Sequence, residues 1–229
     1  MITGKKIVSF SLWGTSAKYT VGAVKNAELV RQMYPGWTAR FYCGTSVPHD
    51  IIQQLKNCES EVILMQSPGD WTGMFWRFNA AGDEDVNVMI SRDCDSRISQ
   101  REVDAVNAWI NSDYLFHIMR DHPWHGTPIL GGMWGVKAPL LRNMKQLTEQ
   151  FKKGNYWQID QNFLKLLYPH VEKHAMIHDE FFSKRPWPTK REKLEFVGQV
   201  FDENENTVQE HLDVLARHIE SNESDCLPI

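Results

Sequence analysis

The chain has 229 residues, of which 42% are hydrophobic, and this is enough for one large or two small hydrophobic cores. Its net charge of −4 provides no general basic field, so nucleic acid is not an expected partner. Residues 1–14 lack the features of a signal peptide, and no apolar run reaches the roughly 20 residues of a membrane span. These properties predict a soluble, cytoplasmic protein. The four cysteines form no CxxC pair, so we expect reduced thiols.

Strand and helix patterns alternate along the first half of the chain. β-rich runs predict strands at residues 6–11, 38–43, 61–66 and 86–90. Apolar residues at helical spacing predict helices at residues 19–33, 48–57 and 71–81. This alternation is typical of βαβ units, which build a mostly parallel sheet with helices on its faces.

The second half of the chain is less regular. Predicted helices cover residues 99–111, 139–151, 159–167 and 207–220. Predicted strands cover residues 116–120, 129–136, 175–178 and 196–201. Ser99 is the expected N-cap of its helix, with Glu102 as the capping-box partner. We therefore predict an α/β fold with one domain over residues 1–220 and a polar tail at 221–229. In this domain a Rossmann-like, mostly parallel sheet is flanked by helices, with a smaller mixed sheet in the second half.

Two aspartates, Asp93 and Asp95, follow the fourth predicted strand. Alternate residues of an extended segment point to the same side, so the two carboxylates would lie one strand-step apart. In parallel α/β sheets, ligands bind outside the carboxyl ends of the strands, which is where this pair falls. Mg²⁺ is usually held by one or two carboxylates together with substrate phosphates. The pair therefore predicts a site for a metal–diphosphate complex, and a solvated turn is the alternative.

Several short segments occur in an order that resembles a known family. The segments are MFWRF (74–78), SRDCDS (91–96), Arg101-Glu102, MRDHP (119–123), GGMWG (131–135), Asp160-Gln161 and His178-Asp179. Together they resemble the GT-A-fold glycosyltransferases that use nucleotide sugars, within a small group that includes the N-terminal domain of a chlorovirus capsid glycosyltransferase. The resemblance implies that Asp93 and Asp95 form a DxD motif that holds Mn²⁺ or Mg²⁺ across the two phosphates of the donor. It also implies a UDP-sugar donor and a glycan or glycoconjugate acceptor.

The resemblance assigns further residues to the donor. Ser11, Leu12 and Trp13 follow the first strand, where such folds hold the base and ribose. Cys94 lies inside the metal motif, and Gly131-Gly132 would lie beside the donor sugar, with a simple β-bulge as the alternative. Arg77 would bind a phosphate or sugar hydroxyls. The alternative is an ion pair between Arg77 and one of the acidic residues 83–85. Arg92 should face the other side of the sheet and support it.

The resemblance also implies that the third metal ligand and the catalytic base come from the second half of the chain. His178 occupies the place of the third ligand, with Asp179 as its substitute, and a hydrogen-bonded structural histidine is the alternative. An inverting transferase needs a base for the acceptor hydroxyl. Asp121 and Asp160 are joint candidates for this base, although Asp160 also suits a carboxylate at a helix N-terminus.

Three other classes of protein fit parts of the pattern. A degenerate, transferase-like carbohydrate-binding protein would use the aspartates for a structural ion. Aspartate-based phosphotransferases place their Asp-x-Asp after the first strand, whereas here it follows the fourth. A nucleotidyltransferase would show a glycine- and lysine-rich phosphate loop near the N-terminus, and the chain has neither that loop nor a dinucleotide fingerprint. The leading prediction is a metal-dependent glycosyltransferase.

Overall fold

The computed structural model describes residues 4–151 and 154–224. Its strands are β1 (Lys5–Leu12), β2 (Thr38–Cys43), β3 (Glu61–Leu64), β4 (Val86–Ser91), β5 (Phe116–Arg120), β6 (Trp134–Val136) and β7 (Ala175–Asp179). Within these described ranges the strands form one seven-stranded sheet in the order β3-β2-β1-β4-β6-β5-β7. β6 is antiparallel to both neighbours and the other pairings are parallel. The predicted α/β class is confirmed, and the mixed second-half strands continue the same sheet from β4.

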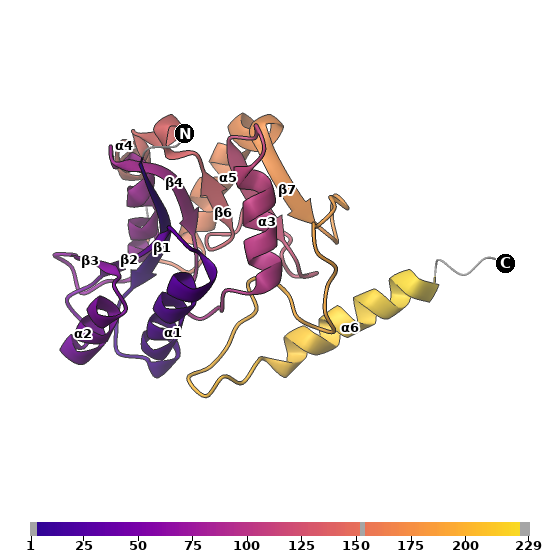
Figure 1. Ribbon diagram of the computed structural model, residues 1–229, viewed down its shortest axis with the longest axis horizontal. Coiled ribbons are helices and arrows are strands. Elements are labelled where there is room, and N and C mark those ends of the chain that lie inside the picture. Colours follow the sequence, from indigo (N-terminus) through magenta and orange to yellow (C-terminus); the bar gives the residue numbers. More distant parts are fainter. Residues whose placement is uncertain (1–3, 152–153, 225–229) are drawn as a thin grey trace.

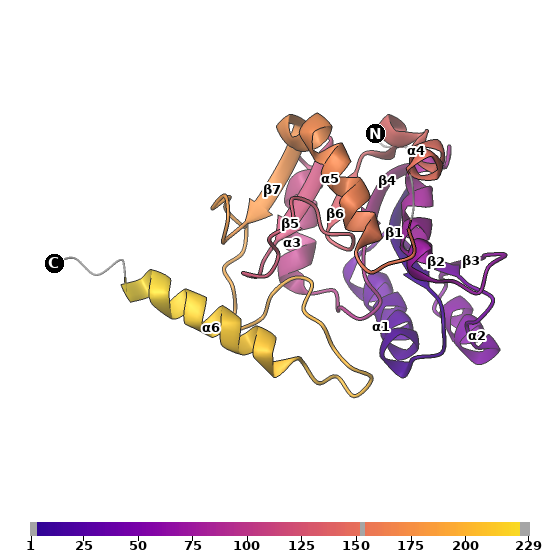
Figure 2. The same cartoon turned by 180° about the vertical axis from the view of Figure 1, so that it is seen from behind.

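Helices cover both faces of this sheet (Figures 1 and 2). The α-helices are α1 (Ala17–Met33), α2 (His49–Asn57), α3 (Gln100–Ile110), α4 (Met144–Gln150), α5 (Ile159–Val171) and α6 (Gln209–Ser224). The 3₁₀ segments are η1 (Trp71–Gly82), η2 (Ala138–Leu141) and η3 (Glu172–His174). One large core cluster joins the sheet to α1, α2 and α3, and a second joins it to η1, α4 and α5. A small third cluster consists of Ala105, Met119, Met133 and Val197. α6 projects from the body of the molecule (Figure 1).

The alternation of residues along β1 explains how these two cores form. Val8, Phe10 and Leu12 pack into the cluster on the α1 side, where Phe10 stacks on Phe41. Ile7 packs into the cluster on the η1 side. Ser9 and Ser11 share the face of Ile7 because side chains alternate with a period of two. The buried hydroxyls of these two serines therefore face η1 and need hydrogen-bond partners there.

A buried ion pair links β4 to α3. Ser99 caps α3 as predicted, with its hydroxyl accepting a hydrogen bond from the Glu102 amide at 3.3 Å. The Glu102 side chain does not complete the predicted capping box. Its carboxylate accepts from Arg92 Nε at 2.7 Å and from the Tyr34 hydroxyl at 3.0 Å. Arg92 thus supports the sheet, as the sequence predicted.

Two predicted strands differ in the structure. The strand predicted at 129–136 is reduced to β6, because Gly131-Gly132 lies in a turn before it. Residues 196–201 form isolated bridges and no strand, and Gly198 within them has φ +84°, which interrupts extended backbone. The polar tail was predicted at 221–229, but α6 continues through 221–224 to Ser224, and the remaining residues 225–229 lie outside the described residues.

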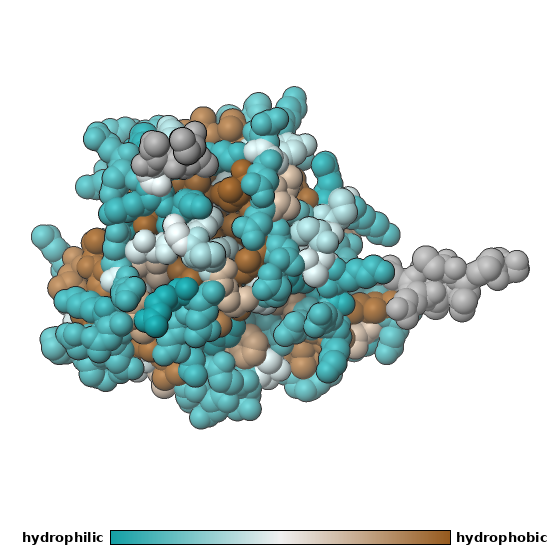
Figure 3. Space-filling model, in the orientation of Figure 1, coloured by the Kyte–Doolittle hydropathy of each residue, from teal (hydrophilic) through white to brown (hydrophobic). Residues whose placement is uncertain are grey.

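The surface over α1–α3 is mostly hydrophilic (Figure 3). Charged and polar side chains cover this face, and apolar side chains form small patches between them (Figure 3). Among the described residues, no helix combines the length and the apolar character needed to cross a membrane.

We expect Glu102→Gln to lower the free energy of unfolding by about 3–5 kcal/mol, because it leaves the buried charge of Arg92 without a partner. Glu205→Gln is the matched control at the more exposed pair with Arg97, and it should cost less than about 1 kcal/mol. Urea-induced unfolding measures both changes. A loss for Glu102→Gln no larger than for the control would show that the pair is not a major support of the sheet.

Candidate active site

A pocket of about 550 Å³ opens at the carboxyl ends of β1 and β4. This size falls within the range of about 300–1,000 Å³ that is usual for small-molecule sites. Its lining residues come from segments that are far apart in the sequence, within residues 11–19, 71–77, 93–95, 122–133, 157–161 and 196–211. Ser11, Leu12 and Trp13, which end or follow β1, are among them.

Asp93 and Asp95 both line this pocket, directly after β4. The side chain of Asp93 is 47% exposed, so part of it is accessible from the pocket. Asp95 is more buried, and its Oδ2 lies 2.8 Å from Lys18 Nζ. Burial raises the pKa of the Asp95 carboxyl, the charge of Asp93 raises it further, and Lys18 lowers it. The two carboxylates therefore repel each other across the pocket.

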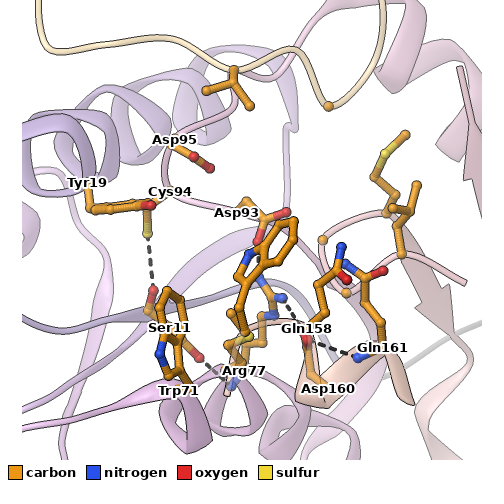
Figure 4. Close-up of a pocket in the computed structure, with 18 of the residues that line it drawn as sticks. Ser11, Tyr19, Trp71, Arg77, Asp93, Cys94, Asp95, Gln158, Asp160 and Gln161 are labelled. Atoms are coloured by element: carbon orange, nitrogen blue, oxygen red, sulfur yellow. Dashed lines mark hydrogen bonds and ion pairs between the residues drawn. The ribbon is translucent and has the colours of Figure 1, made fainter. Parts of the chain in front are cut away.

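Arg77 lies between the pocket carboxylates (Figure 4). Its buried guanidinium forms ion pairs with Asp93 and with Asp160, the latter at 2.7 Å from Nη2 to Oδ2. Nη1 also donates to the carbonyl oxygen of Arg92 at 3.1 Å. Arg77 therefore does not pair with the acidic residues 83–85. Both of its terminal nitrogens are occupied by groups of the protein. The side chain instead fixes the distance between two segments of the pocket.

The backbone of Arg77 is held by the two serines of β1. The Ser11 hydroxyl accepts from the Arg77 amide at 2.9 Å, and the Ser9 hydroxyl donates to its carbonyl oxygen at 2.6 Å. The Cys94 thiol donates to the Ser11 carbonyl oxygen at 3.3 Å. Ser11 and Cys94 thus connect β1, η1 and the aspartate motif (Figure 4). No local sequence pattern indicates this role for Ser9.

Gly131 and Gly132 let the carboxylates approach the backbone before β6. A Cβ atom at Gly131 would overlap Asp160 Oδ2, and a Cβ atom at Gly132 would overlap Asp93 Oδ2. The Gly131 carbonyl oxygen also accepts from the Ser91 hydroxyl at 2.7 Å. The close approach that these glycines allow is therefore that of the pocket carboxylates Asp93 and Asp160.

Asp160 reaches the pocket from the first turn of α5. The chain enters this helix through Gln158, whose φ of 66° is in the left-handed region. Asp160 Oδ1 accepts from the Gln161 amide at 2.9 Å, and Arg77 binds the other oxygen. Burial raises the pKa of the Asp160 carboxyl, and the charge of Arg77 lowers it.

Asp121 and His178 lie outside the pocket lining. Asp121 accepts two hydrogen bonds of 2.9 Å from Arg101 and one of 2.8 Å from Arg191, so its carboxylate is fully occupied. His178 Nδ1 lies 2.8 Å from His117 Nε2, and burial lowers the pKa of His178 to about 4. The structure therefore does not bring either residue to Asp93 and Asp95.

Asp179, the expected substitute for His178, is also committed elsewhere. It pairs with Arg120 at 2.8 Å and accepts hydrogen bonds from the backbone amides of residues 181–183. These bonds close the turn after β7. Among the described residues, no group of three or more His, Cys, Asp or Glu side chains is arranged to hold a metal ion.

One wall of the pocket was not predicted from the sequence. It consists of residues after β5, of the segment that leads into α6 and of the first turn of α6, namely His122, Trp124, His125, Phe196, Gly198, Val200 and His211. The Phe201 amide donates to the Asp95 carbonyl oxygen at 2.8 Å and so fastens this segment to the aspartate motif. No local sequence pattern indicates that His122, His125 or His211 faces a pocket.

Gly132→Ala should destabilise the protein by about 1–3 kcal/mol, because the added methyl group forces Asp93 out of its position. Gly126→Ala is the matched control, since its nearest neighbour is an atom of Phe182 at 3.7 Å. The control should change stability by no more than about 0.5 kcal/mol. Thermal and urea unfolding measure both, and equal stability of the two variants would contradict the tight packing at Gly132.

No family profile matches the chain. No curated protein matches it either. Among solved structures, glucosyl-3-phosphoglycerate synthase from Mycobacterium tuberculosis with Mn²⁺, UDP and glucosyl-3-phosphoglycerate matches at 10% identity and a TM-score of 0.51, over 99% of this chain and 81% of that chain. The synthase with Mg²⁺ and UDP matches at 8% identity and a TM-score of 0.52, over 82% of this chain and 73% of that one.

A glycosyltransferase involved in glycosylation of the major capsid of PBCV-1 matches at 15% identity and a TM-score of 0.46. That match covers 76% of this chain and 83% of the viral one. The identities are low, so the likeness concerns the arrangement of strands and helices. The synthase matches extend over most of both chains, and the chain described here has a GT-A-like glycosyltransferase fold.

Proposed function

We propose that the chain is a metal-dependent glycosyltransferase that moves a sugar from a nucleotide sugar to a hydroxyl of a glycan or glycoconjugate. The observation that carries the proposal is the position of Asp93 and Asp95, which enter one pocket at the carboxyl end of a central strand. Solved structures of the same fold contain UDP with Mn²⁺ or Mg²⁺. UDP-sugar is therefore the proposed donor.

The residues of the pocket suit a divalent cation. The carboxylates of Asp93, Asp95 and Asp160 outnumber the two cations paired with them, Arg77 and Lys18. Mg²⁺ and Mn²⁺ need few protein ligands, because phosphate and water oxygens fill the other positions. Asp93 and Asp95 would hold the ion, which would neutralise charge on the departing diphosphate. Lys18 would supply a further positive charge beside Asp95.

The remaining lining residues divide between the two substrates. Ser11, Leu12 and Trp13 at the end of β1 would face the nucleoside, as would Tyr19. Gly131 and Gly132 line the pocket against Asp160 and Asp93 and would lie beside the donor sugar. Cys94 would act through the bond of its thiol to Ser11, since the thiol is buried.

Asp160 is the proposed base of the transfer. The acceptor oxygen bonds to the anomeric carbon, whose bond to the diphosphate oxygen breaks and leaves its electron pair on the diphosphate. The proton of the acceptor hydroxyl passes to the carboxylate. A carboxyl whose pKa is raised by burial holds a proton better than an exposed one. Asp121 is not proposed for this step, because it lies outside the lining of the pocket, whereas Asp160 belongs to it.

A UDP-sugar at 100 times its dissociation constant, with Mn²⁺, should raise the free energy of unfolding by about 2.7 kcal/mol. EDTA should abolish the effect, and Asp95→Asn should remove most of it. Asp50→Asn, at an exposed residue of α2, is the matched control and should keep the full shift. Thermal shift with a panel of nucleotide sugars is the measurement. If no nucleotide sugar stabilised the protein in the presence of Mn²⁺, the proposed function would be wrong.

Arg77→Lys should lower the rate of Mn²⁺-dependent UDP release by at least about 100-fold, because a lysine cannot bridge Asp93 and Asp160 and the carboxylates would shift. Arg40→Lys is the control for structural damage. Arg40 is equally buried and bridges Glu61 and Asp83, away from the pocket. The two variants should lose stability similarly, but only Arg77→Lys should lose turnover. Comparable turnover in both variants would show that Arg77 is not required in the active site.

A further inference from the structure

The aspartate motif divides the pocket into two halves. β1 lies on one side of β4 in the sheet, and β6 and β5 lie on the other. Ser11, Tyr19 and Trp71 accordingly lie on one side of Asp93, and Gln158, Asp160 and Gln161 lie on the other (Figure 4). The proposed function places the nucleoside in the β1 half. This leaves the half beside β5 and α5, the far half, for the acceptor.

Positive charge is missing from the far half. Its described lining residues include no lysine, and Arg77, the arginine at its boundary, is already bound to Asp93 and Asp160. The nearby guanidinium groups of Arg101 and Arg191 are bound to Asp121 and Glu180. A phosphate or carboxylate on an acceptor would therefore find no uncommitted lysine or arginine to pair with among the described lining residues.

The histidines of the far half are neutral hydrogen-bonding groups. The Asp121 amide donates to His125 Nδ1 at 3.0 Å, which places the ring proton on Nε2. Burial lowers the pKa of His125 to about 3, so the ring carries no charge at neutral pH. No described residue accepts from its Nε2, and this N–H group is available to a ligand oxygen. His122 is already bonded at both ring nitrogens.

Two tryptophans of the far half are exposed. Trp124 is 52% exposed and Trp157 is 65% exposed, although both line the pocket. His211 holds the Trp124 ring at its edge, with a centroid distance of 5.3 Å and an angle of 82° between the planes. A large aromatic ring left open at a pocket wall provides an apolar face that suits the C–H surface of a sugar ring. The amide side chains of Gln158 and Gln161 add uncharged donors and acceptors.

We propose that the acceptor is an uncharged sugar, bound in the far half between Trp124 and Trp157 with the His125 Nε2–H group donating to one of its oxygens. The proposal rests on the proposed glycosyltransferase function and narrows its acceptor. Sugar phosphates and sugar acids are disfavoured, because the described lining of this half offers no lysine or arginine that is not already ion-paired. The tryptophans provide affinity, and the histidine and glutamines select the orientation of the hydroxyls.

The test is a binding experiment on the full chain with UDP and Mn²⁺ present. The probes are the methyl glycosides of glucose, galactose, mannose and N-acetylglucosamine, and the corresponding 6-phosphates. Saturation-transfer NMR and titration of tryptophan fluorescence report binding without turnover. At least one neutral glycoside should bind, and its 6-phosphate should bind no more tightly than the neutral sugar.

The variants separate stacking from general damage. Trp124→Ala and Trp157→Ala should each weaken binding of the neutral glycoside about five- to tenfold, and Trp124→Phe should restore most of the loss. Trp37→Ala is the control, because Trp37 packs against Tyr34 and lies outside the pocket lining. It should bind the glycoside like the unchanged protein. Circular dichroism confirms that each variant is folded.

Three results would overturn the proposal. Tighter binding of the 6-phosphates would show that the acceptor is an anion. Unchanged affinity in both alanine variants would place the acceptor elsewhere. Absence of glycoside binding, in protein that UDP-sugar and Mn²⁺ do stabilise, would reject the neutral acceptor and leave the proposed function intact. A lack of stabilisation by nucleotide sugars would be a separate result, because the thermal shift is measured without an acceptor.

Discussion

The pocket depends on one guanidinium group. Arg77 binds Asp93 after β4 and Asp160 at the start of α5, and so joins two segments that lie more than sixty residues apart. Burying this charge is favourable only because both carboxylates compensate it. Ser9 and Ser11 then fix the Arg77 backbone, and the glycines before β6 allow the carboxylates to lie directly on the chain. The same arrangement keeps Asp93 half exposed.

The sequence predicted the framework well for a physical reason. Periodicity and turn residues are local signals, and they are strongest in the buried, alternating strands and helices of the first half. Asp93 and Asp95 could be placed at a strand end because their position depends only on where β4 stops. The same logic explains the errors. Glu102 satisfied a local capping pattern, but the buried charge of Arg92 provides a stronger partner for its carboxylate.

The rest of the site follows from contacts between distant segments. Asp121 and Asp160 were equivalent in the sequence, since nothing local shows that two arginines surround one and that the other faces a pocket. The same holds for His178, whose partner His117 lies on the neighbouring strand β5. The wall that includes His211 depends on how residues 196–211 return to the aspartate motif. Such packing decides whether a polar residue is structural or faces a ligand.

The hydrogen bond from Phe201 to the backbone of Asp95 has a consequence for folding. The pocket draws its walls from residues as far apart as Ser11 and His211, so it exists only after almost the whole chain has reached its native arrangement. Contacts of such large sequence separation form late and slowly. A ligand in this pocket therefore joins the first strand to the last helix. Only the folded chain can bind such a ligand, so binding indicates that folding is complete. The bound ligand also stabilises the chain against local unfolding that separates the first strand from the last helix.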